Sequence, residues 1–198
     1  MQKLKKALRQ GDVWVKVEFE SYCLNEVFVT NQRFFLRTRS LEVIKEVMKD
    51  LKIVTDKPLE VIVSRRGFEL NKFPDWSKII PDATQLMGIT WTELFRKPMC
   101  RWGILADGTY IFIDETYYQA VVEVAQKYRV QEQGIAWFGS GELQTIVVPL
   151  KDFNEKPAMI DYSQDFVLLM PIRIDHNRMD RDLKVLRLEY NQESENGS

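Results

Sequence analysis

Residues 34–53 read FFLRTRSLEVIKEVMKDLKI, and residues 111–130 read IFIDETYYQAVVEVAQKYRV. Each stretch begins with three apolar residues of the kind found in β-strands and continues with apolar residues at helical spacing, i, i+3, i+4 and i+7. The two patterns coincide when one stretch is shifted by 77 residues onto the other. Each stretch therefore predicts a short strand that leads into an amphipathic helix, over 41–51 in the first and 117–128 in the second.

Two explanations account for this likeness. Only three of the 20 aligned pairs are identical, and any strand followed by an amphipathic helix obeys the same burial periodicities, so coincidence is one explanation. An internal duplication is the other, because a strand hairpin is also predicted after each helix, over 59–70 and 135–148. We expect an α+β fold with a mainly antiparallel sheet covered by the two amphipathic helices. A duplication would divide this fold into pseudo-duplicated β-α-β-β halves.

The length of the chain fits one large domain. We expect residues 1–190 to form a single α+β domain. Its halves would span 12–70 and 100–175, and the irregular segment 71–99, which three prolines interrupt, would connect them. The polar tail 191–198 is predicted to be disordered.

Local signals add detail to this outline. Thr90-Trp91-Thr92-Glu93 has the spacing of a capping box and predicts a short helix through Phe95. Thr116-Tyr117-Tyr118-Gln119 repeats that spacing at the start of helix 117–128. Asp107-Gly108 is the residue pair typical of a type I′ hairpin turn.

Two further segments carry glycine and proline signals. Gly139-Ser140-Gly141 predicts a hairpin turn between flanking strands. Residues 166–174 form an apolar run with Pro171 inside it, which predicts an edge strand or a bulge because proline cannot donate a backbone hydrogen bond.

Composition limits the classes of function. Apolar residues make up 45% of the chain, and 28 basic residues balance 29 acidic ones, so no global field favours nucleic acid or an anionic membrane. Cys23 and Cys100 lie in apolar, strand-like surroundings and are expected to be buried free thiols. No secretory signal and no run of 18 apolar residues occurs. We therefore expect a cytoplasmic location without membrane contact.

No arrangement of residues typical of catalysis stands out, so we expect no enzymatic activity, no metal and no cofactor. The single histidine, His176, excludes a site with several histidine ligands. Gly139-Ser140-Gly141 lacks both the glycine spacing of a nucleophile elbow and the lysine of a phosphate loop. The leading hypothesis is a non-enzymatic binding or regulatory protein that acts through a protein partner or through self-association.

Three sets of residues carry the functional hypotheses. For protein–protein contact, the candidates are large aromatic residues around the connector: Trp76, Trp91, Phe95 and Trp102. For nucleic acid, the alternative, they are basic residues interleaved with aromatic ones: Lys5, Lys6, Arg33, Arg37, Arg39, Arg65 and Arg66. For a carboxylate- or metal-dependent enzyme, the second alternative, they are acidic residues at predicted strand ends and in loops: Asp107, Asp114 and Asp175. The three hypotheses can be distinguished only if the residues of one set lie close together in the folded chain.

Overall fold

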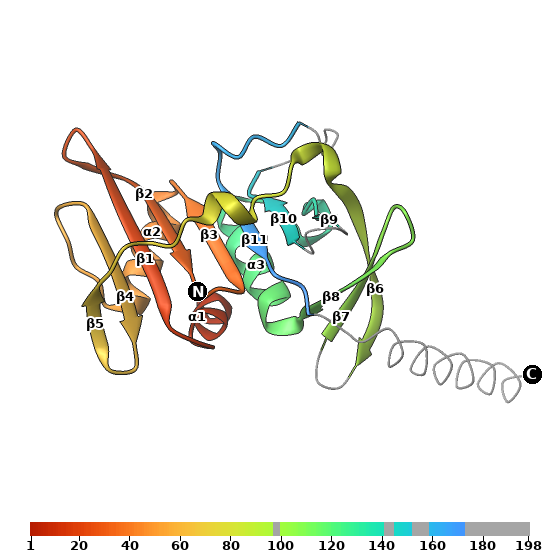
Figure 1. The fold of residues 1–198 in the computed structure, drawn as a ribbon, viewed down its shortest axis with the longest axis horizontal. Helices are drawn as coiled ribbons and strands as arrows, with labels where there is room; N and C mark the ends of the chain where they lie inside the picture. Colours follow the sequence, from red (N-terminus) through yellow and green to blue (C-terminus); the bar gives the residue numbers. More distant parts are fainter. Residues whose placement is uncertain (97–99, 141–144, 152–158, 173–198) are drawn as a thin grey trace, which may run out of the picture.

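The structure is a computed structural model that describes residues 1–96, 100–140, 145–151 and 159–172, with the backbone alone for residues 93–96. In these ranges, one antiparallel sheet of eleven strands carries helices on its surface (Figure 1). The helices are α1 (Gln2–Leu8), α2 (Leu41–Leu51) and α3 (Glu115–Lys127), with short 3-10 helices η1 (Trp76–Ile79), η2 (Ala83–Gln85) and η3 (Glu132–Gly134). The strands are β1 (Val13–Glu20), β2 (Cys23–Thr30), β3 (Phe34–Thr38), β4 (Leu59–Ser64), β5 (Gly67–Leu70), β6 (Met87–Arg96), β7 (Cys100–Leu105), β8 (Tyr110–Asp114), β9 (Phe138–Ser140), β10 (Thr145–Pro149) and β11 (Phe166–Leu169).

The strand order contains two similar runs. The full order is β5-β4-β1-β2-β3-β11-β10-β9-β6-β7-β8. The N-terminal half contributes β3-β2-β1-β4-β5, with α2 between β3 and β4 along the chain, and the C-terminal half contributes β8-β7-β6-β9-β10, with α3 between β8 and β9. Strand β11 joins the two runs because it pairs antiparallel with β3 on one side and with β10 on the other.

Apolar side chains alternate along the strands and form a core on each face of the sheet. On one face, strand residues such as Val15 and Leu36 pack with the apolar sides of α1, α2 and α3. On the other face, Phe35 and its neighbours pack beneath the connector, through Phe73 and Trp76. In Figure 1 helix α2 lies behind β1 and β2, and the connector crosses in front of these strands.

Helix α2 occupies the predicted range 41–51. The Ser40 hydroxyl accepts a hydrogen bond from the Val43 N–H at 3.5 Å, which satisfies one of the free donors at the helix N-terminus. Lys52 adopts the left-handed conformation, with φ 57°, and ends the helix. Helix α1 packs on the same face, and its Lys5 Nζ lies 3.1 Å from the Asp50 carboxylate of α2.

The helix predicted through residues 90–95 is wrong, because this segment lies in strand β6. The β6 backbone pairs with β7 on one side and with β9 on the other. Threonine and tryptophan favour strands as readily as short helices, so pairing of this segment with β7 outweighs the capping-box spacing. The second capping box is displaced as well, because Asp114 caps α3 by accepting from the Thr116 N–H at 2.7 Å.

The predicted hairpin between β7 and β8 is present, but its turn is not type I′. A type I′ turn needs positive φ at both central residues. Gly108 has φ +87°, whereas Asp107 does not have a positive φ. The Asp107 carboxylate instead accepts from the Thr109 N–H at 2.8 Å, and the glycine follows as a bulge.

Two other local predictions are wrong. Gly139 and Ser140 lie in strand β9 opposite Ile146 and Thr145, so they are not turn residues. Strand β11 ends at Leu169, before Pro171, and lies in the interior of the sheet, so it is neither an edge strand nor a bulge. Pro171 does lie outside the strand, but a proline at that position does not indicate which strands pair with β11.

Cys23 and Cys100 form no disulfide in the structure. Cys100 is buried as predicted, whereas Cys23 is exposed at the start of β2, which corrects the expectation for that residue. Among the described residues, no helix has the length and apolar composition that crossing a membrane requires. The tail 191–198 lies outside the described residues.

Close packing at Gly139 gives a direct test of how β9 packs against Leu105 of β7. A Cβ atom at Gly139 would lie 2.7 Å from Leu105 Cδ2, whereas a Cβ at Gly88, in neighbouring strand β6, would have no atom within 4 Å. We expect Gly139→Ala to lower the free energy of unfolding by about 1–3 kcal/mol through overpacking. Gly88→Ala, the matched control, should change it by less than about 0.5 kcal/mol. Urea denaturation measures both, and equal effects would contradict this packing.

Candidate binding site at the free edge of the sheet

The three tryptophans proposed for partner contact lie in separate aromatic clusters. Trp76 packs against Phe35, Trp91 against Trp137, and Trp102 against Phe112, with ring centroids 5.1, 5.2 and 5.0 Å apart. Trp102 is only 2% exposed. Phe95 lies in β6 opposite Arg101, in the part where only the backbone is described. The structure therefore does not bring these four residues together on one surface.

The acidic residues proposed for carboxylate chemistry support local structure. Asp107 orders the β7–β8 turn, and its hydrogen bonds to Thr109 lower the pKa of the carboxyl group. Asp114 caps α3. Asp175 and His176 lie outside the described residues. In the parts that the structure describes, no group of three or more His, Cys, Asp or Glu residues could hold a metal ion.

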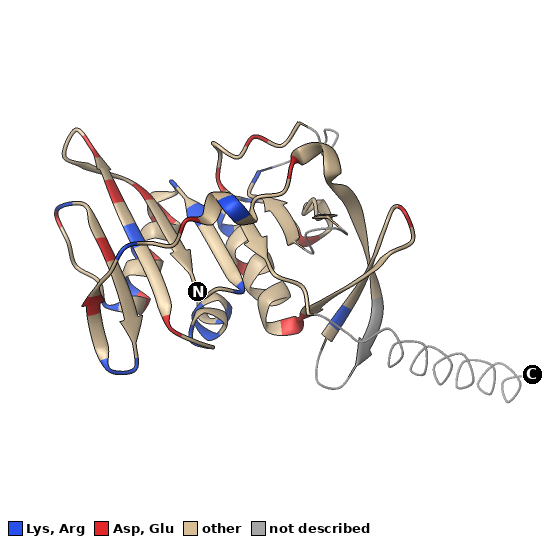
Figure 2. Cartoon of the chain, viewed as in Figure 1, with Lys and Arg blue, Asp and Glu red and all other residues tan. Residues whose placement is uncertain are grey.

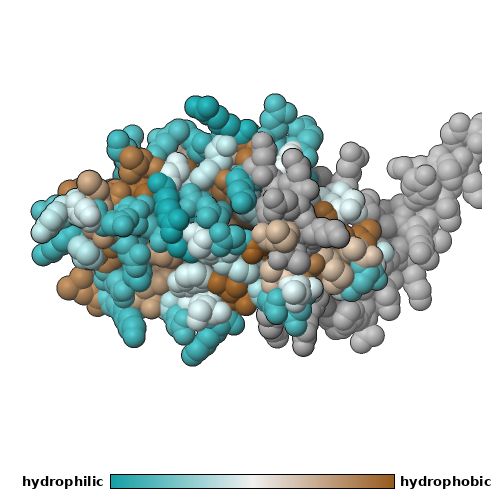
Figure 3. Space-filling view, turned by 90° about the horizontal axis from the view of Figure 1, so that it is seen from above, coloured by the Kyte–Doolittle hydropathy of each residue, from teal (hydrophilic) through white to brown (hydrophobic). Residues whose placement is uncertain are grey.

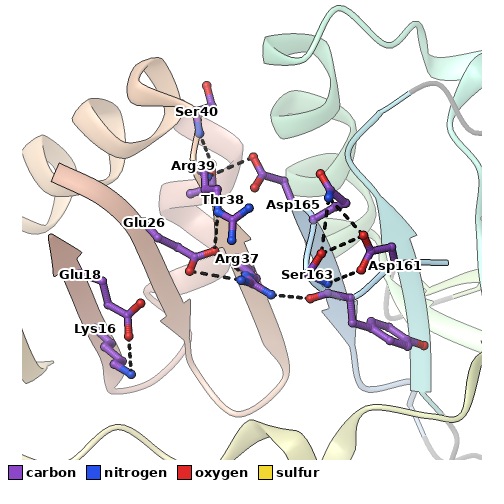
Figure 4. A network of polar contacts seen from close by, with 12 residues as sticks. Lys16, Glu18, Glu26, Arg37, Thr38, Arg39, Ser40, Asp161, Ser163 and Asp165 are labelled. Carbon is purple, nitrogen blue, oxygen red and sulfur yellow. Dashed lines mark hydrogen bonds and ion pairs between the residues drawn. The ribbon is translucent and has the colours of Figure 1, made fainter. Parts of the chain in front are cut away.

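Two of the predicted basic residues are neutralised at the junction between the halves (Figure 4). The carboxylate of Glu26, which is 3% exposed, accepts from Arg37 Nε, and its second oxygen accepts from Arg37 Nη2 at 3.2 Å. Arg39 Nε lies 3.3 Å from the same carboxylate. Arg37 also donates to the carbonyl oxygen of Tyr162, which precedes β11. These arginines therefore fix β2, β3 and the β11 segment to one another.

A second network crosses the same junction on the helix side. The Tyr128 hydroxyl, at the end of α3, donates to Asp165 Oδ2 at 2.6 Å and accepts from the Thr38 hydroxyl. Asp165 Oδ2 also accepts from the Arg39 N–H at 3.0 Å. Burial, followed by the hydrogen bond to Asp165, raises the pKa of Tyr128 well above its usual value. The phenol stays neutral and acts as a structural link between β3, β11 and α3.

The other predicted basic residues lie outside this junction network. Lys5 is paired with Asp50, and Lys6 is exposed on α1. Arg33 is exposed just before β3. Arg65 and Arg66 are exposed at the β4–β5 turn, where Figure 2 shows a basic loop. The predicted basic set is therefore divided between a structural group and an exposed group.

An open groove of about 1050 Å³ lies beside this turn. The β4–β5 hairpin forms one wall, and the C-terminal ends of α1 and α2 with the loop before β1 form the other. Four cationic side chains line the groove: Arg9, Lys52, Arg65 and Arg66. Within the described part of the chain, none of these four has an ion-pair partner. Asp12, Asp50 and Glu69 also line the groove, but Asp50 is engaged by Lys5, so cations are in excess.

Among the strands that the structure describes, β5 has a neighbour on one side only, and it carries exposed apolar side chains. Phe68 is 53% exposed and Leu70 is 81% exposed. Both lie opposite valines of β4, so they lie on the helix side of the sheet. In the view of Figure 3, hydrophobic patches are visible among hydrophilic side chains, including at the end of the molecule that carries β4 and β5. An exposed apolar edge strand is a template for pairing with another chain.

The backbone of β5 also has unused hydrogen-bonding groups. The Asn71 N–H donates to the Glu60 carbonyl at 3.3 Å, so residue 71 faces β4. Because bonded and non-bonded pairs alternate in an antiparallel ladder, Glu69 and Gly67 face β4 as well. The N–H and C=O groups of Phe68 and Leu70 therefore point away from the sheet. Together with the cationic groove, this edge is the candidate binding site.

Sequence reasoning identified part of this site. Arg65 and Arg66 were proposed for nucleic acid, and Phe68 was placed in the second strand of a hairpin. The exposure of Phe68 and Leu70 was missed, because strand alternation does not reveal whether a strand lies at the edge of a sheet. Arg9 and Lys52 join the site only through the folding of two helix ends toward the hairpin.

Comparison with protein-family models, curated proteins and solved structures finds no match to this chain.

The buried Glu26–Arg37 pair predicts a large difference between two glutamates on the same sheet face. Glu26→Gln would leave Arg37 with its charge uncompensated, so we expect the free energy of unfolding to fall by about 3 kcal/mol. Glu18→Gln removes the exposed partner of Lys16 and should cost at most about 1 kcal/mol. Urea denaturation of both variants measures the difference. Similar small losses would contradict a structural role for the Glu26 network.

Proposed function

We propose that this chain is a non-enzymatic binding protein that recognises a partner protein at the β5 edge. The observation that supports this is the coincidence of two exposed apolar side chains, Phe68 and Leu70, with outward backbone groups and a cationic groove. Edge pairing supplies affinity through main-chain hydrogen bonds, and neighbouring side chains supply specificity. We place this activity in the cytoplasm, in keeping with the free thiols.

A proposed internal duplication supports the choice of β5. The runs β3-β2-β1-β4-β5 and β8-β7-β6-β9-β10 follow the same chain order, and β5 corresponds to β10. In this chain the outer edge of β10 is occupied by β11. We propose that the halves arose by duplication of a unit of three strands, a helix and two strands. The outer edge of β5 then corresponds to the outer edge of β10, which pairs with β11.

Nucleic-acid binding is the second candidate, because the unpaired cations of the groove are also suited to phosphate groups. It is weaker because Arg37 and Arg39 are engaged by Glu26 and Lys5 by Asp50. A gel shift at low salt separates the candidates. Retarded mobility of a short DNA or RNA that depends on Arg65 and Arg66 would favour the nucleic-acid candidate.

Site-specific photo-crosslinking tests the proposed function. A benzophenone amino acid at position 68 or 70 should crosslink the same protein from extract of cells that contain this chain, because both positions face the occupied edge. The same group at Tyr22, which is fully exposed at the β1–β2 turn, is the matched control and should not crosslink that protein. The double substitution Arg65→Glu with Arg66→Glu should reduce the product by at least about fivefold, since it reverses the charge of the groove. A product independent of position, or none at 68 and 70, would overturn the proposal.

A further inference from the structure

We propose that the segment bound at β5 is an extended strand that runs antiparallel to β5, has apolar side chains at alternate positions and carries acidic residues at its C-terminal end. This inference depends on the proposed function and specifies the chemistry and direction of the partner.

The direction follows from the sheet itself. Every strand pair in the described part of the chain is antiparallel, including β11 on β10, the strand that corresponds to β5. Strand β5 runs from the β4–β5 turn toward the connector. An antiparallel partner therefore enters beside Leu70, passes Phe68 and leaves beside Arg65 and Arg66.

The alternation of the bound segment follows from the two faces of β5. Phe68 and Leu70 lie on the helix side, and Glu69 lies on the other side. Residues directly opposite each other in a pair share a face. The bound segment therefore places apolar side chains beside Phe68 and Leu70 and polar side chains on the side of Glu69. Strand β11 shows a suitable degree of apolarity, because Val167 and Leu169 occupy the helix side opposite β10.

The acidic C-terminal end follows from charge. Arg65 and Arg66 precede β5 at the turn, and Arg9 and Lys52 line the opposite wall of the groove. All four lack an ion-pair partner in the described residues. The end of the segment that leaves past the turn is thus the end nearest the excess positive charge, where carboxylates of the partner are stabilised.

A second copy of this chain fits the edge less well. If β5 paired with β5 of another copy so that Phe68 lay opposite Leu70, the two Glu69 side chains would be directly opposite each other. Like charges in that position destabilise a strand pair. Both arginine-bearing turns would also meet a cationic rather than an acidic neighbour. A partner with its own acidic residues satisfies both constraints.

Three labelled peptides test this inference on the full chain by fluorescence anisotropy. Each has the same central run of alternating valine and threonine. The first ends in two glutamates, the second begins with them, and the third repeats the first with a proline in place of the central valine. All three have blocked termini, so that only the position of the glutamates and the capacity for strand pairing differ.

We expect the first peptide to bind about fivefold to tenfold more tightly than the second, because two favourable ion pairs near a surface supply a difference of that size. This preference should shrink when the salt concentration rises from about 0.05 M to about 0.5 M. The proline peptide should bind most weakly, because it lacks an N–H needed for pairing. Phe68→Lys with Leu70→Lys should abolish binding, since charged side chains block edge pairing, whereas Tyr22→Lys should leave it unchanged.

The outcomes separate this inference from the proposed function. Equal binding of the first two peptides, or tighter binding of the second, overturns the assigned direction and charge. Binding of none of the peptides also overturns the inference, even if the crosslink at position 68 still identifies a partner. Loss of the crosslink at 68 and 70 overturns the proposed function itself. Dimerisation in sedimentation that Phe68→Lys abolishes would replace the acidic partner with a second copy.

Discussion

Two hydrogen-bonded ladders hold β11 between β3 and β10, and they make a single sheet from the two halves of the chain. Side chains reinforce this junction on both faces. On the connector side, Arg37 links the Glu26 carboxylate to the Tyr162 carbonyl, and on the helix side Tyr128 links Thr38 to Asp165. Because these networks are largely buried, the loss of one group would leave its partner without a hydrogen bond and would lower the stability of the fold. β11 and the residues just before it therefore help to fix the relative placement of the halves, together with the packing of α1 against α3.

Strand β5 ends the first run of strands as β10 ends the second, but among the described strands β5 has no neighbour equivalent to β11. Strand β10 is covered by β11, whereas β5 ends the sheet with Phe68 and Leu70 exposed. Natural proteins commonly protect edge strands with inward-pointing charges, prolines or bulges. β5 itself carries a single charged residue, Glu69, and the basic residues lie at the adjoining turn and groove. The proposed role in strand pairing would account for such an accessible edge.

Much of the N-terminal half could be predicted from the sequence, because its signals are local. The Ser40 cap and the stripe of apolar residues after it define α2, and alternating residues define β1. The errors arise where long-range neighbours decide the outcome. Thr90 belongs to a strand because it pairs with Ile104 of β7, and Gly139 lies in β9 close to the Leu105 side chain rather than in a turn. The exposure of β5 likewise depends on which strand occupies the next position, which periodicity cannot reveal.

Amide hydrogen exchange of the free protein, resolved by residue, tests the central claim that β5 is an open edge at the end of a sheet held together by β11. The account predicts that the amides of Phe68 and Leu70 exchange rapidly, that Glu69 between them exchanges more slowly because its N–H faces β4, and that Val167 and Leu168 in β11 are among the slowest amides. Equal protection of Phe68, Glu69 and Leu70 would show that β5 is already covered. Rapid exchange throughout β11 would show that it does not join the two halves.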